Sequence, residues 1–258
     1  MAIWVYEFDE RDRERIKAEI DAEACIYCRT PLTVLAQQPK PVAENDLRHG
    51  GKRSQTLSTC PVCGWWFIKA MDRLKFDDYR SSFTYGASSV LRHLDLSDQT
   101  IPLAEIRNYL AARYDDRFSV DPARFEELVA SVYRGLGYDV EATGRTGDGG
   151  IDAVLRGPGN EVVGVQIKRY RNKIEAEQIR SFTGALCIKG LLRGVFVTTS
   201  QFTRGAQDTS RQAIRANVAI ELVDAHKFYE QLRIAQRDAY RDFDEPGTPY
   251  ENAILWMV

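Results

Sequence analysis

The chain has 258 residues, of which 44% are apolar and 28% are charged, and a formal net charge of −2. This length is enough for one large domain or two small ones, and the composition is ordinary for a soluble globular protein. The charge points to no class of partner, and no apolar run approaches the about 18 residues of a membrane span. The start of the chain has no apolar segment behind a basic one, so we expect no signal peptide and a cytoplasmic location.

Two cysteine pairs dominate the first hundred residues. Cys25 and Cys28 form one C-x-x-C pair, and Cys60 and Cys63 form the other, which is followed by a glycine and an aromatic stretch. In a chain without a signal peptide, such pairs indicate a metal site more often than disulfides. We therefore predict that residues 1–100 form a zinc-ribbon-like domain with a structural Zn²⁺, although the spacing between the pairs is longer than in the usual ribbon.

Other interpretations of these cysteines stay open from the sequence. They could be unrelated pairs or a redox motif, although neither pair clearly follows a strand and opens a helix. Nearby bases and aromatic residues could contact nucleic acid, and His49 could replace a thiolate, although four thiolates already complete the shell. Around the pairs we expect a strand at 2–8, a helix at 9–23 and a polar, proline-containing loop after Pro31.

Residues 101–120 are predicted to be a connecting helix and linker. Apolar residues recur at helical spacing after Pro102, and a charged, polar stretch at 115–122 is the expected domain boundary. Asp121 is placed to cap the next helix, with Pro122 at its first position.

The pattern of residues 121–237 predicts an α/β domain with a mixed sheet flanked by helices. A helix with an apolar face ends at Gly137, and a strand and a glycine-rich loop follow. Strands at about 150–156 and 161–168 then form a hairpin, after which helices and apolar strands alternate. An antiparallel meander is thus followed by crossover units. We expect residues 238–258 to form a tail.

Polar side chains gather in the predicted hairpin. Asp152 lies just inside the first apolar run, and Gln166 and Lys168 alternate near the end of the second. Alternate residues of a strand share one face, so Ile167 between them is expected to point into the core. Pairing of the two runs would bring a carboxylate, an amide oxygen and an ammonium group together. Such a patch suits a divalent cation and a phosphate.

A basic segment begins at the same place. Residues 165–194 contain seven bases and two acids, a local net of +5 (7 − 2). Alone, such a run is as consistent with a solvated face as with binding. Arg169, Arg171 and Lys173, together with Arg145 in the glycine-rich loop, could contact flanking phosphates, which gives affinity without sequence preference.

Together these motifs resemble the Mrr-type restriction endonuclease domain of the PD-(D/E)XK nuclease superfamily. The resemblance rests on FEELVASVYRGLGYDV, GDGGIDAVL, VVGVQIKRY and GVFVTTSQFTRGA, which occur in this order within about residues 121–232. It implies that Asp152 binds a metal, that Lys168 is the superfamily lysine and that Glu126 is the helix glutamate. Gln166 stands where the wider superfamily has Glu or Asp, and a neutral amide oxygen binds Mg²⁺ more weakly than a carboxylate.

The resemblance further implies a Mg²⁺-dependent DNA endonuclease that acts in restriction or in defence against foreign or modified DNA. DNA is the expected partner, a homodimer and an activating partner or defence-system component are compatible with this function, and no membrane partner is expected. One alternative is a DNA-binding module without cleavage, which the presence of both Asp152 and Lys168 disfavours. The other is a structure-specific, junction-type nuclease in repair.

The remaining candidate residues have plainer interpretations. The Thr-Thr-Ser sequence at 198–200 ends a strand, so it could cap the next helix or contact the substrate backbone. Cys187 is expected in the core. His93 and His226 have no second His or Cys close by, so we do not expect either to bind a metal.

Overall fold

The structure is a computed structural model that describes residues 23–41, 51–75, 80–88, 93–143 and 150–239. Within these ranges the chain forms two compact units, which are divided between His93 and Leu94. Several predictions fall wholly or almost wholly outside the described residues, namely the strand at 2–8, the helix at 9–23, the tail at 238–258, His49 and Arg145.

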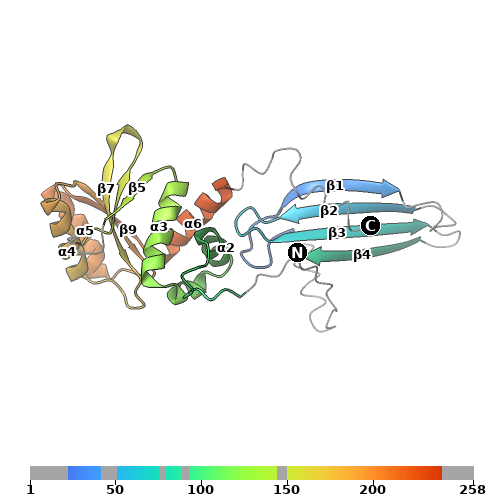
Figure 1. Cartoon of the computed structure of the whole chain (residues 1–258), viewed down its shortest axis with the longest axis horizontal. Coiled ribbons are helices and arrows are strands. Elements are labelled where there is room, and N and C mark those ends of the chain that lie inside the picture. The colour runs from blue at the N-terminus through green and yellow to red at the C-terminus, as the bar shows by residue number, and fades with distance from the viewer. Residues whose placement is uncertain (1–22, 42–50, 76–79, 89–92, 144–149, 240–258) are drawn as a thin grey trace. The chain divides into compact units, whose positions relative to one another are not determined.

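The first unit contains a four-stranded antiparallel sheet (Figure 1). Its strands pair in sequence order and are β1 (Thr33–Pro41), β2 (Gly51–Thr59), β3 (Trp66–Lys75) and β4 (Arg80–Ser88). Leu57 on β2 and Ile68 on β3 are register partners. Both are buried, and they form a small core with the partly buried Leu35, Ala36 and Trp66.

The proline-containing loop that was expected between the cysteine pairs is a wrong prediction. This segment instead forms β1 and β2, and Thr33 pairs with Thr59 at the end of the hairpin next to the cysteines. The prolines of β1 are tolerated because β1 is an edge strand, where a missing N–H need not break the ladder. The hairpin also accounts for the long spacing between the pairs, since it leaves the first cysteine turn and returns to the second.

The second unit, Leu94–Ala239, contains a five-stranded mixed sheet in the order β5-β6-β7-β8-β9. The first three strands pair antiparallel and the last three pair parallel. The strands are β5 (Asp139–Ala142), β6 (Ala153–Arg156), β7 (Val162–Lys168), β8 (Arg193–Thr198) and β9 (Ala219–Val223). From residue 122 onward, the α-helices of this unit are α3 (Pro122–Gly135), α4 (Ala176–Ile188), α5 (Arg204–Ala213) and α6 (Ala225–Ala239). The predicted fold class and order of elements are therefore confirmed.

Helices cover both faces of this sheet, with α4 and α5 on one side and α3 and α6 on the other (Figure 1). Gly164 on β7 and Gly194 on β8 are register partners beneath α4. A Cβ atom at Gly164 would lie 2.6 Å from Leu186 Cδ2, and one at Gly194 would lie 2.5 Å from Leu186 Cδ1. The absence of a side chain at both positions therefore allows α4 to pack this closely on the strands.

The segment predicted as a connecting helix and linker is instead part of the second unit. It contains α2 (Leu103–Ala112) and the 3-10 helix η1 (Tyr114–Ser119). Ile106 and Leu110 of α2 are fully buried, and Tyr229 Oη on α6 donates a hydrogen bond to the carbonyl of Ala111 at 2.9 Å. The helix α2 therefore contributes to the core of this unit.

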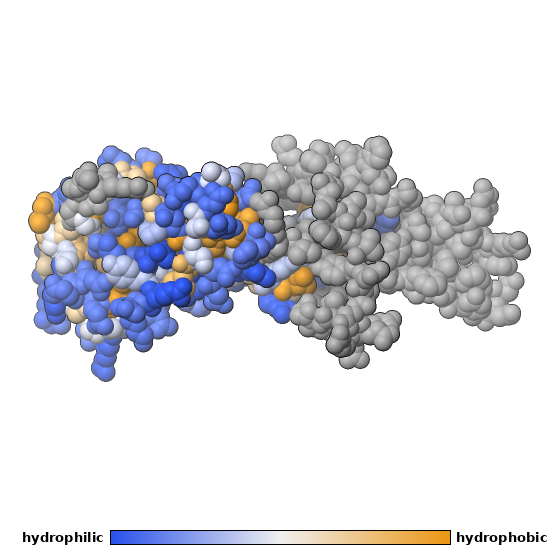
Figure 2. All heavy atoms as spheres, turned by 60° about the horizontal axis from the view of Figure 1, so that its bottom comes forward, coloured by the Kyte–Doolittle hydropathy of each residue, from blue (hydrophilic) through white to orange (hydrophobic). Residues whose placement is uncertain are grey.

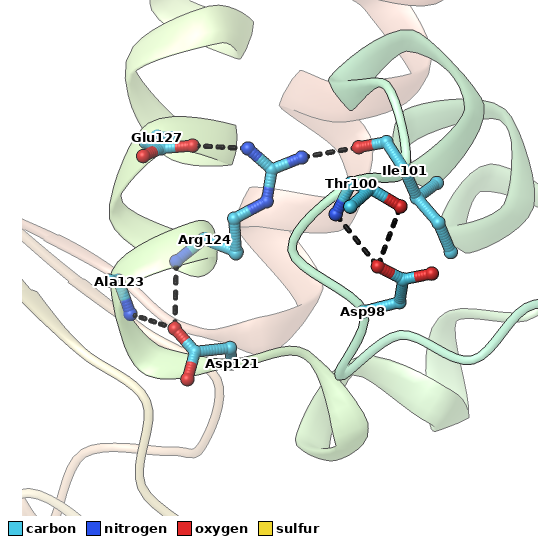
Figure 3. A network of polar contacts seen from close by, with 7 residues as sticks. All are labelled: Asp98, Thr100, Ile101, Asp121, Ala123, Arg124 and Glu127. Atoms are coloured by element: carbon cyan, nitrogen blue, oxygen red, sulfur yellow. Dashed lines mark hydrogen bonds and ion pairs between the residues drawn. The ribbon is translucent and has the colours of Figure 1, made fainter.

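The start of α3 is fixed as the sequence predicts. Asp121 Oδ1 accepts hydrogen bonds from the backbone N–H groups of Ala123 at 2.9 Å and Arg124 at 3.3 Å. The guanidinium of Arg124 binds Glu127 on one side and donates to the carbonyl of Ile101 on the other (Figure 3). The first turn of α3, which precedes the candidate helix glutamate Glu126, is thereby held to the chain that leads into α2.

The surface of the second unit is mostly hydrophilic on the face that Figure 2 shows, with hydrophobic residues scattered among the hydrophilic ones. Ile188 at the end of α4 is 86% exposed. None of the helices within the described residues combines the length and the apolar character that crossing a membrane requires.

Cys187 was expected in the core, and this prediction is wrong. Its side chain is exposed on α4, next to Ile188. The buried face of the helix is formed by Ile179, Phe182 and Leu186, and a helix turns by about 100° per residue. Cys187 therefore lies beside the apolar stripe, although its sequence neighbours are apolar.

Candidate functional site

Asp152 is fixed against β7 immediately before β6 begins. Its backbone N–H donates to the carbonyl of Val165 at 2.8 Å, and its Oδ2 accepts a hydrogen bond from the backbone N–H of Ile167 at 2.6 Å. A short hydrogen bond to an ionised carboxylate is a strong one, so it holds the side chain in one orientation. The structure thus brings Asp152 to the end of β7.

Gln166 lies on the face of β7 that is turned toward α4. A Cβ atom at Gly150 would lie 3.6 Å from Gln166 Nε2 and 3.7 Å from Ala185 Cβ on α4. Gln166 is only 8% exposed. Lys168 is half-buried two residues later, and Ile167 between them is buried. The alternation along β7 is therefore as predicted.

Glu126 lies on α3, the helix on the opposite side of the sheet from α4 (Figure 1). It is half-buried, next to Phe125, which is fully buried and packs against α6. The structure brings Asp152, Gln166 and Lys168 together at the ends of two paired strands. The contribution of Glu126 to the same site stays a prediction.

The polar residues at the end of β8 hold the chain that leaves β7. Their hydroxyl groups donate to three carbonyls of that segment, in the pairs Thr198–Lys168 (2.9 Å), Thr199–Tyr170 (2.8 Å) and Ser200–Arg171 (3.1 Å). All three side chains are buried. The helix α5 is capped by Thr203 instead. The two roles that the sequence suggested for residues 198–200, a helix cap or a contact with substrate, are therefore replaced by a structural one.

The four basic residues that were expected to contact phosphates have different surroundings. Arg169 Nη1 donates to the carbonyl of Phe118 at 2.7 Å, so this side chain is turned toward the protein. The exposed Arg171 lies over the Phe118 ring, with its guanidinium carbon 4.7 Å from the ring centroid. Lys173 is exposed, and Arg145 lies outside the described residues. Arg171 and Lys173 are therefore the better placed of the described residues to reach a ligand.

Arg117 and Phe118 of η1 also contact this region, although nothing in the sequence distinguishes them. Arg117 Nε donates to the carbonyl of Thr199 at 3.0 Å, and its guanidinium lies 4.3 Å from the centroid of the Phe118 ring. Their partners Thr199 and Arg169 lie 82 and 51 residues further along the chain. A local sequence pattern cannot predict contacts between residues this far apart in the sequence.

In the part of the chain that the structure describes, four sulfur atoms meet at one end of the first sheet. The Sγ atoms of Cys25, Cys28, Cys60 and Cys63 all lie within 4.8 Å of one another. The sulfur–sulfur distances are 3.5 Å for Cys25–Cys63, 3.4 Å for Cys28–Cys60 and 3.8 Å for Cys28–Cys63. A disulfide would need about 2.05 Å. Zinc–sulfur bonds of about 2.3 Å place the sulfurs of a tetrahedron roughly 3.8 Å apart, so the cluster has the size of a zinc centre.

The two cysteine turns have the same backbone geometry. The N–H of Arg29 donates to the carbonyl of Cys25 at 2.9 Å, and that of Gly64 donates to the carbonyl of Cys60 at 3.0 Å. Arg29 and Gly64 both have a left-handed backbone, with φ of 61° and 73°. The N–H of Cys63 also points to the sulfur of Cys60 at 3.5 Å. The turn at the second pair, which ends in a glycine, is therefore repeated at the first pair, where Arg29 stands at the position that favours glycine.

The thiols perturb one another because they share hydrogen bonds. The bond with Cys25 lowers the pKa of the Cys28 thiol and also that of Cys60. The bond with Cys28 raises the pKa of Cys25, and the bond with Cys25 raises that of Cys63. Two of the four sulfurs, those of Cys28 and Cys60, thus favour the thiolate form that binds metals.

Residues 118–232 match the Mrr_cat family model, which describes a restriction endonuclease. The chain is also 39% identical over 127 residues to the Type IV methyl-directed restriction enzyme EcoKMrr of Escherichia coli (strain K12). This match covers 46% of the chain and 41% of that enzyme, so the chain spans less than half the length of this relative. The predicted resemblance of the second unit to the Mrr-type domain is confirmed.

Two solved structures are similar over parts of the chain. One is the ATP-dependent Type ISP restriction-modification enzyme LlaBIII bound to DNA, at 21% identity and a TM-score of 0.31, with 52% of this chain and 8% of that chain covered. The other is a repair endonuclease from Pyrococcus abyssi, at 12% identity and a TM-score of 0.25, with 87% of this chain and 99% of that chain covered. TM-scores this low establish no shared fold.

Proposed function

We propose that the chain is a divalent-metal-dependent DNA endonuclease of a restriction or defence system, with Asp152, Gln166 and Lys168 at its site of phosphodiester hydrolysis. The observation that carries the proposal is the hydrogen bond from the Ile167 N–H to Asp152 Oδ2, which holds the carboxylate beside Gln166. This bond lies within the segment that matches the restriction endonuclease family.

The donor atoms of the site fit a hard cation. Phosphodiester hydrolysis needs an in-line water, neutralisation of charge at the phosphate and help for the leaving oxygen. Asp152 and Gln166 offer a carboxylate and an amide oxygen, which are ligand types of Mg²⁺, and Glu126 would add a second carboxylate. When bound, the cation supplies Lewis acidity and a more acidic water. Gln166 supports this role, since its polar side chain is nearly buried and precedes Ile167, whose N–H binds Asp152.

The remaining charges of the site are positive. Lys168 would place an ammonium group on the attacking oxygen or on a phosphate oxygen. Arg171 and Lys173, which are exposed just beyond β7, would hold flanking phosphates of any sequence. An amide in place of a second strand carboxylate lowers the negative charge of the metal site, so we expect modest metal affinity and one tightly held ion.

The four-cysteine centre would hold a structural Zn²⁺. Its sulfur separations fit a zinc tetrahedron, and all four ligand positions are filled by thiolates, so no open position remains for catalysis. The ion would join the two cysteine turns and thereby the ends of β1, β2 and β3. Its role in this proposal is to stabilise the first unit.

Cleavage of supercoiled plasmid with Mg²⁺ or with EDTA tests the proposed function. We expect nicking or linearisation with Mg²⁺ and none with EDTA, and the comparison of methylated with unmethylated plasmid shows whether modification directs it. Faster cleavage of junctions or flaps than of plasmid would instead favour a structure-specific repair nuclease. Binding of all these DNAs without cleavage of any of them would favour a DNA-binding module.

A further inference from the structure

We infer that Arg117 is a positioning residue of the nuclease site, and this inference rests on the proposed function. The Arg117 side chain joins the 3-10 helix η1 to the end of β8, which in turn holds the end of β7. Lys168 is the last residue of β7. Removal of Arg117 is therefore expected to misplace Lys168 although Arg117 itself touches neither metal nor DNA.

Three contacts anchor the Arg117 guanidinium within η1 and on the sheet. Its Nε donates to the carbonyl of Thr199 at 3.0 Å, and its Nη1 donates to the carbonyl of Tyr114 at 3.1 Å. It also forms an ion pair with Asp115 at 3.4 Å, but that carboxylate is fully exposed and contributes little. The Arg117 side chain is only 16% exposed, so its two bonds to carbonyls are shielded from water.

Thr199, which binds Arg117, is also hydrogen-bonded to the backbone of Lys168. The N–H of Thr199 donates to the carbonyl of Lys168 at 3.3 Å, and Thr198 Oγ1 donates to the same carbonyl at 2.9 Å. Two of the hydrogen bonds that the carbonyl of Lys168 accepts thus come from the end of β8, and a third comes from the N–H of Tyr170 at 3.1 Å. A shift of Thr199 would move these donors, and the position of Lys168 would follow.

A second connection runs from η1 to the segment after β7. The Phe118 ring contacts two guanidinium groups, whose central carbons lie 4.3 Å (Arg117) and 4.7 Å (Arg171) from the ring centroid. The carbonyl of Phe118 accepts the hydrogen bond from Arg169. We call these four residues the η1 clamp. They link η1 to Thr199 at the end of β8 and to the segment after β7, so the inference does not depend on one hydrogen bond alone.

The geometry requires a guanidinium group at position 117. A planar guanidinium donates in its plane to two carbonyls while its face lies on an aromatic ring. The ammonium of a lysine has no Nε donor at the position that reaches Thr199, so Arg117→Lys is expected to behave like Arg117→Ala. Added guanidinium ion is expected to restore part of the lost function in Arg117→Ala only.

The test combines kinetics with hydrogen exchange in the full chain. We expect Arg117→Ala to lower kcat for plasmid cleavage by about 10- to 100-fold and to leave KM within about twofold. Backbone amides of residues 168–173 and 196–201 are expected to exchange faster. The control is Arg211→Ala on α5, which removes an exposed ion pair with Asp208 and should match the wild type in both measurements. Arg117→Gln, which keeps a planar donor, replaces Arg117→Ala if that variant does not fold.

Unchanged exchange in both segments would overturn the inference, whatever the activity. A raised KM with unchanged kcat would also overturn it, because it would place Arg117 in DNA binding. If the wild type cleaves no DNA, the proposed function fails, but the exchange measurement still decides whether Arg117 holds the end of β8 and the segment after β7.

Discussion

The backbone N–H of Ile167 donates a hydrogen bond to Asp152 Oδ2 at 2.6 Å, across two strands of the mixed sheet. This bond joins the residue before β6 to the penultimate residue of β7, which lies between Gln166 and Lys168. It also uses a backbone donor, so it persists when the side chain of Ile167 changes. The backbone of the sheet therefore sets the position of the Asp152 carboxylate. A substitution that removes its negative charge can keep this hydrogen bond.

The Gln166 amide is expected to act as a metal ligand rather than as a packing residue. Gln166→Ala should lower kcat roughly tenfold or more, which corresponds to about 1.4 kcal/mol or more in the barrier, whereas Gln166→Glu should retain more activity because it keeps an oxygen ligand. Single-turnover plasmid cleavage at several Mg²⁺ concentrations measures this difference. Equal activity of the two variants at every concentration would remove Gln166 from the metal site.

The close contact between α4 and β7 depends on Gly164. A Cβ atom there would lie 2.6 Å from Leu186 Cδ2, so Gly164→Ala should lower the free energy of unfolding by about 1–3 kcal/mol through overpacking. Gly184 on α4 is the matched control, since a Cβ atom at this position meets nothing within 4 Å. Gly184→Ala should raise the free energy of unfolding by about 0.5–1 kcal/mol. Urea unfolding measures both, and an equal effect of the two variants would contradict the packing described for α4.

Burial raises the pKa of Tyr114, and its buried hydroxyl has no hydrogen-bond partner among the residues that the structure describes. Tyr114→Phe should therefore raise the free energy of unfolding at neutral pH by about 1 kcal/mol. Above pH about 10 the unfolded chain loses the phenol proton while the folded chain keeps it, so the wild type loses stability and the advantage of the variant should widen.

Tyr229 provides the control for this experiment, because its hydroxyl donates to the carbonyl of Ala111 at 2.9 Å. Tyr229→Phe should lower the free energy of unfolding by about 0.5–1.5 kcal/mol. Chemical unfolding at pH 7 and above pH 10 gives all of these values. A Tyr114→Phe variant that is less stable than the wild type at both pH values would show that its hydroxyl is satisfied.

The zinc centre is expected to need all four thiolates. Cys60→Ser should release the zinc and destabilise the first unit, while Cys187→Ser, which changes an exposed thiol on α4, should keep it. Native mass spectrometry of the purified proteins reports the bound metal directly. Wild-type protein that carries no zinc, or a Cys60→Ser variant that retains it, would contradict the four-thiolate assignment.

Much of the second unit could be predicted because its periodic patterns agree with one another. The apolar face of α3, the capping Asp121 and the continuous apolar run of β8 each favour one local structure, and the order of elements from α3 to α6 follows from them. The alternation of Gln166 and Lys168 could be predicted for the same reason. A strand has only two faces, so the spacing alone assigns both residues to one of them.

The features that escaped prediction depend on partners far away in the chain. Pro39 and Pro41 favour a loop locally, and only the edge position of β1 explains why a strand tolerates them. The hydroxyl group of Thr199 is used for a carbonyl 29 residues earlier, which no local pattern encodes. Arg117 contacts the same end of β8 from a segment that had the composition of a linker.

The most direct test of the central claim is plasmid cleavage by Asp152→Asn with Mg²⁺. Asparagine can still accept the hydrogen bond from Ile167, so the fold is kept while the negative charge is lost. We expect cleavage to fall by at least about a hundredfold, whereas the control Asp208→Asn, which alters an exposed ion pair on α5, cleaves like the wild type. Cleavage by Asp152→Asn at the wild-type rate would show that the hydrolytic site lies elsewhere.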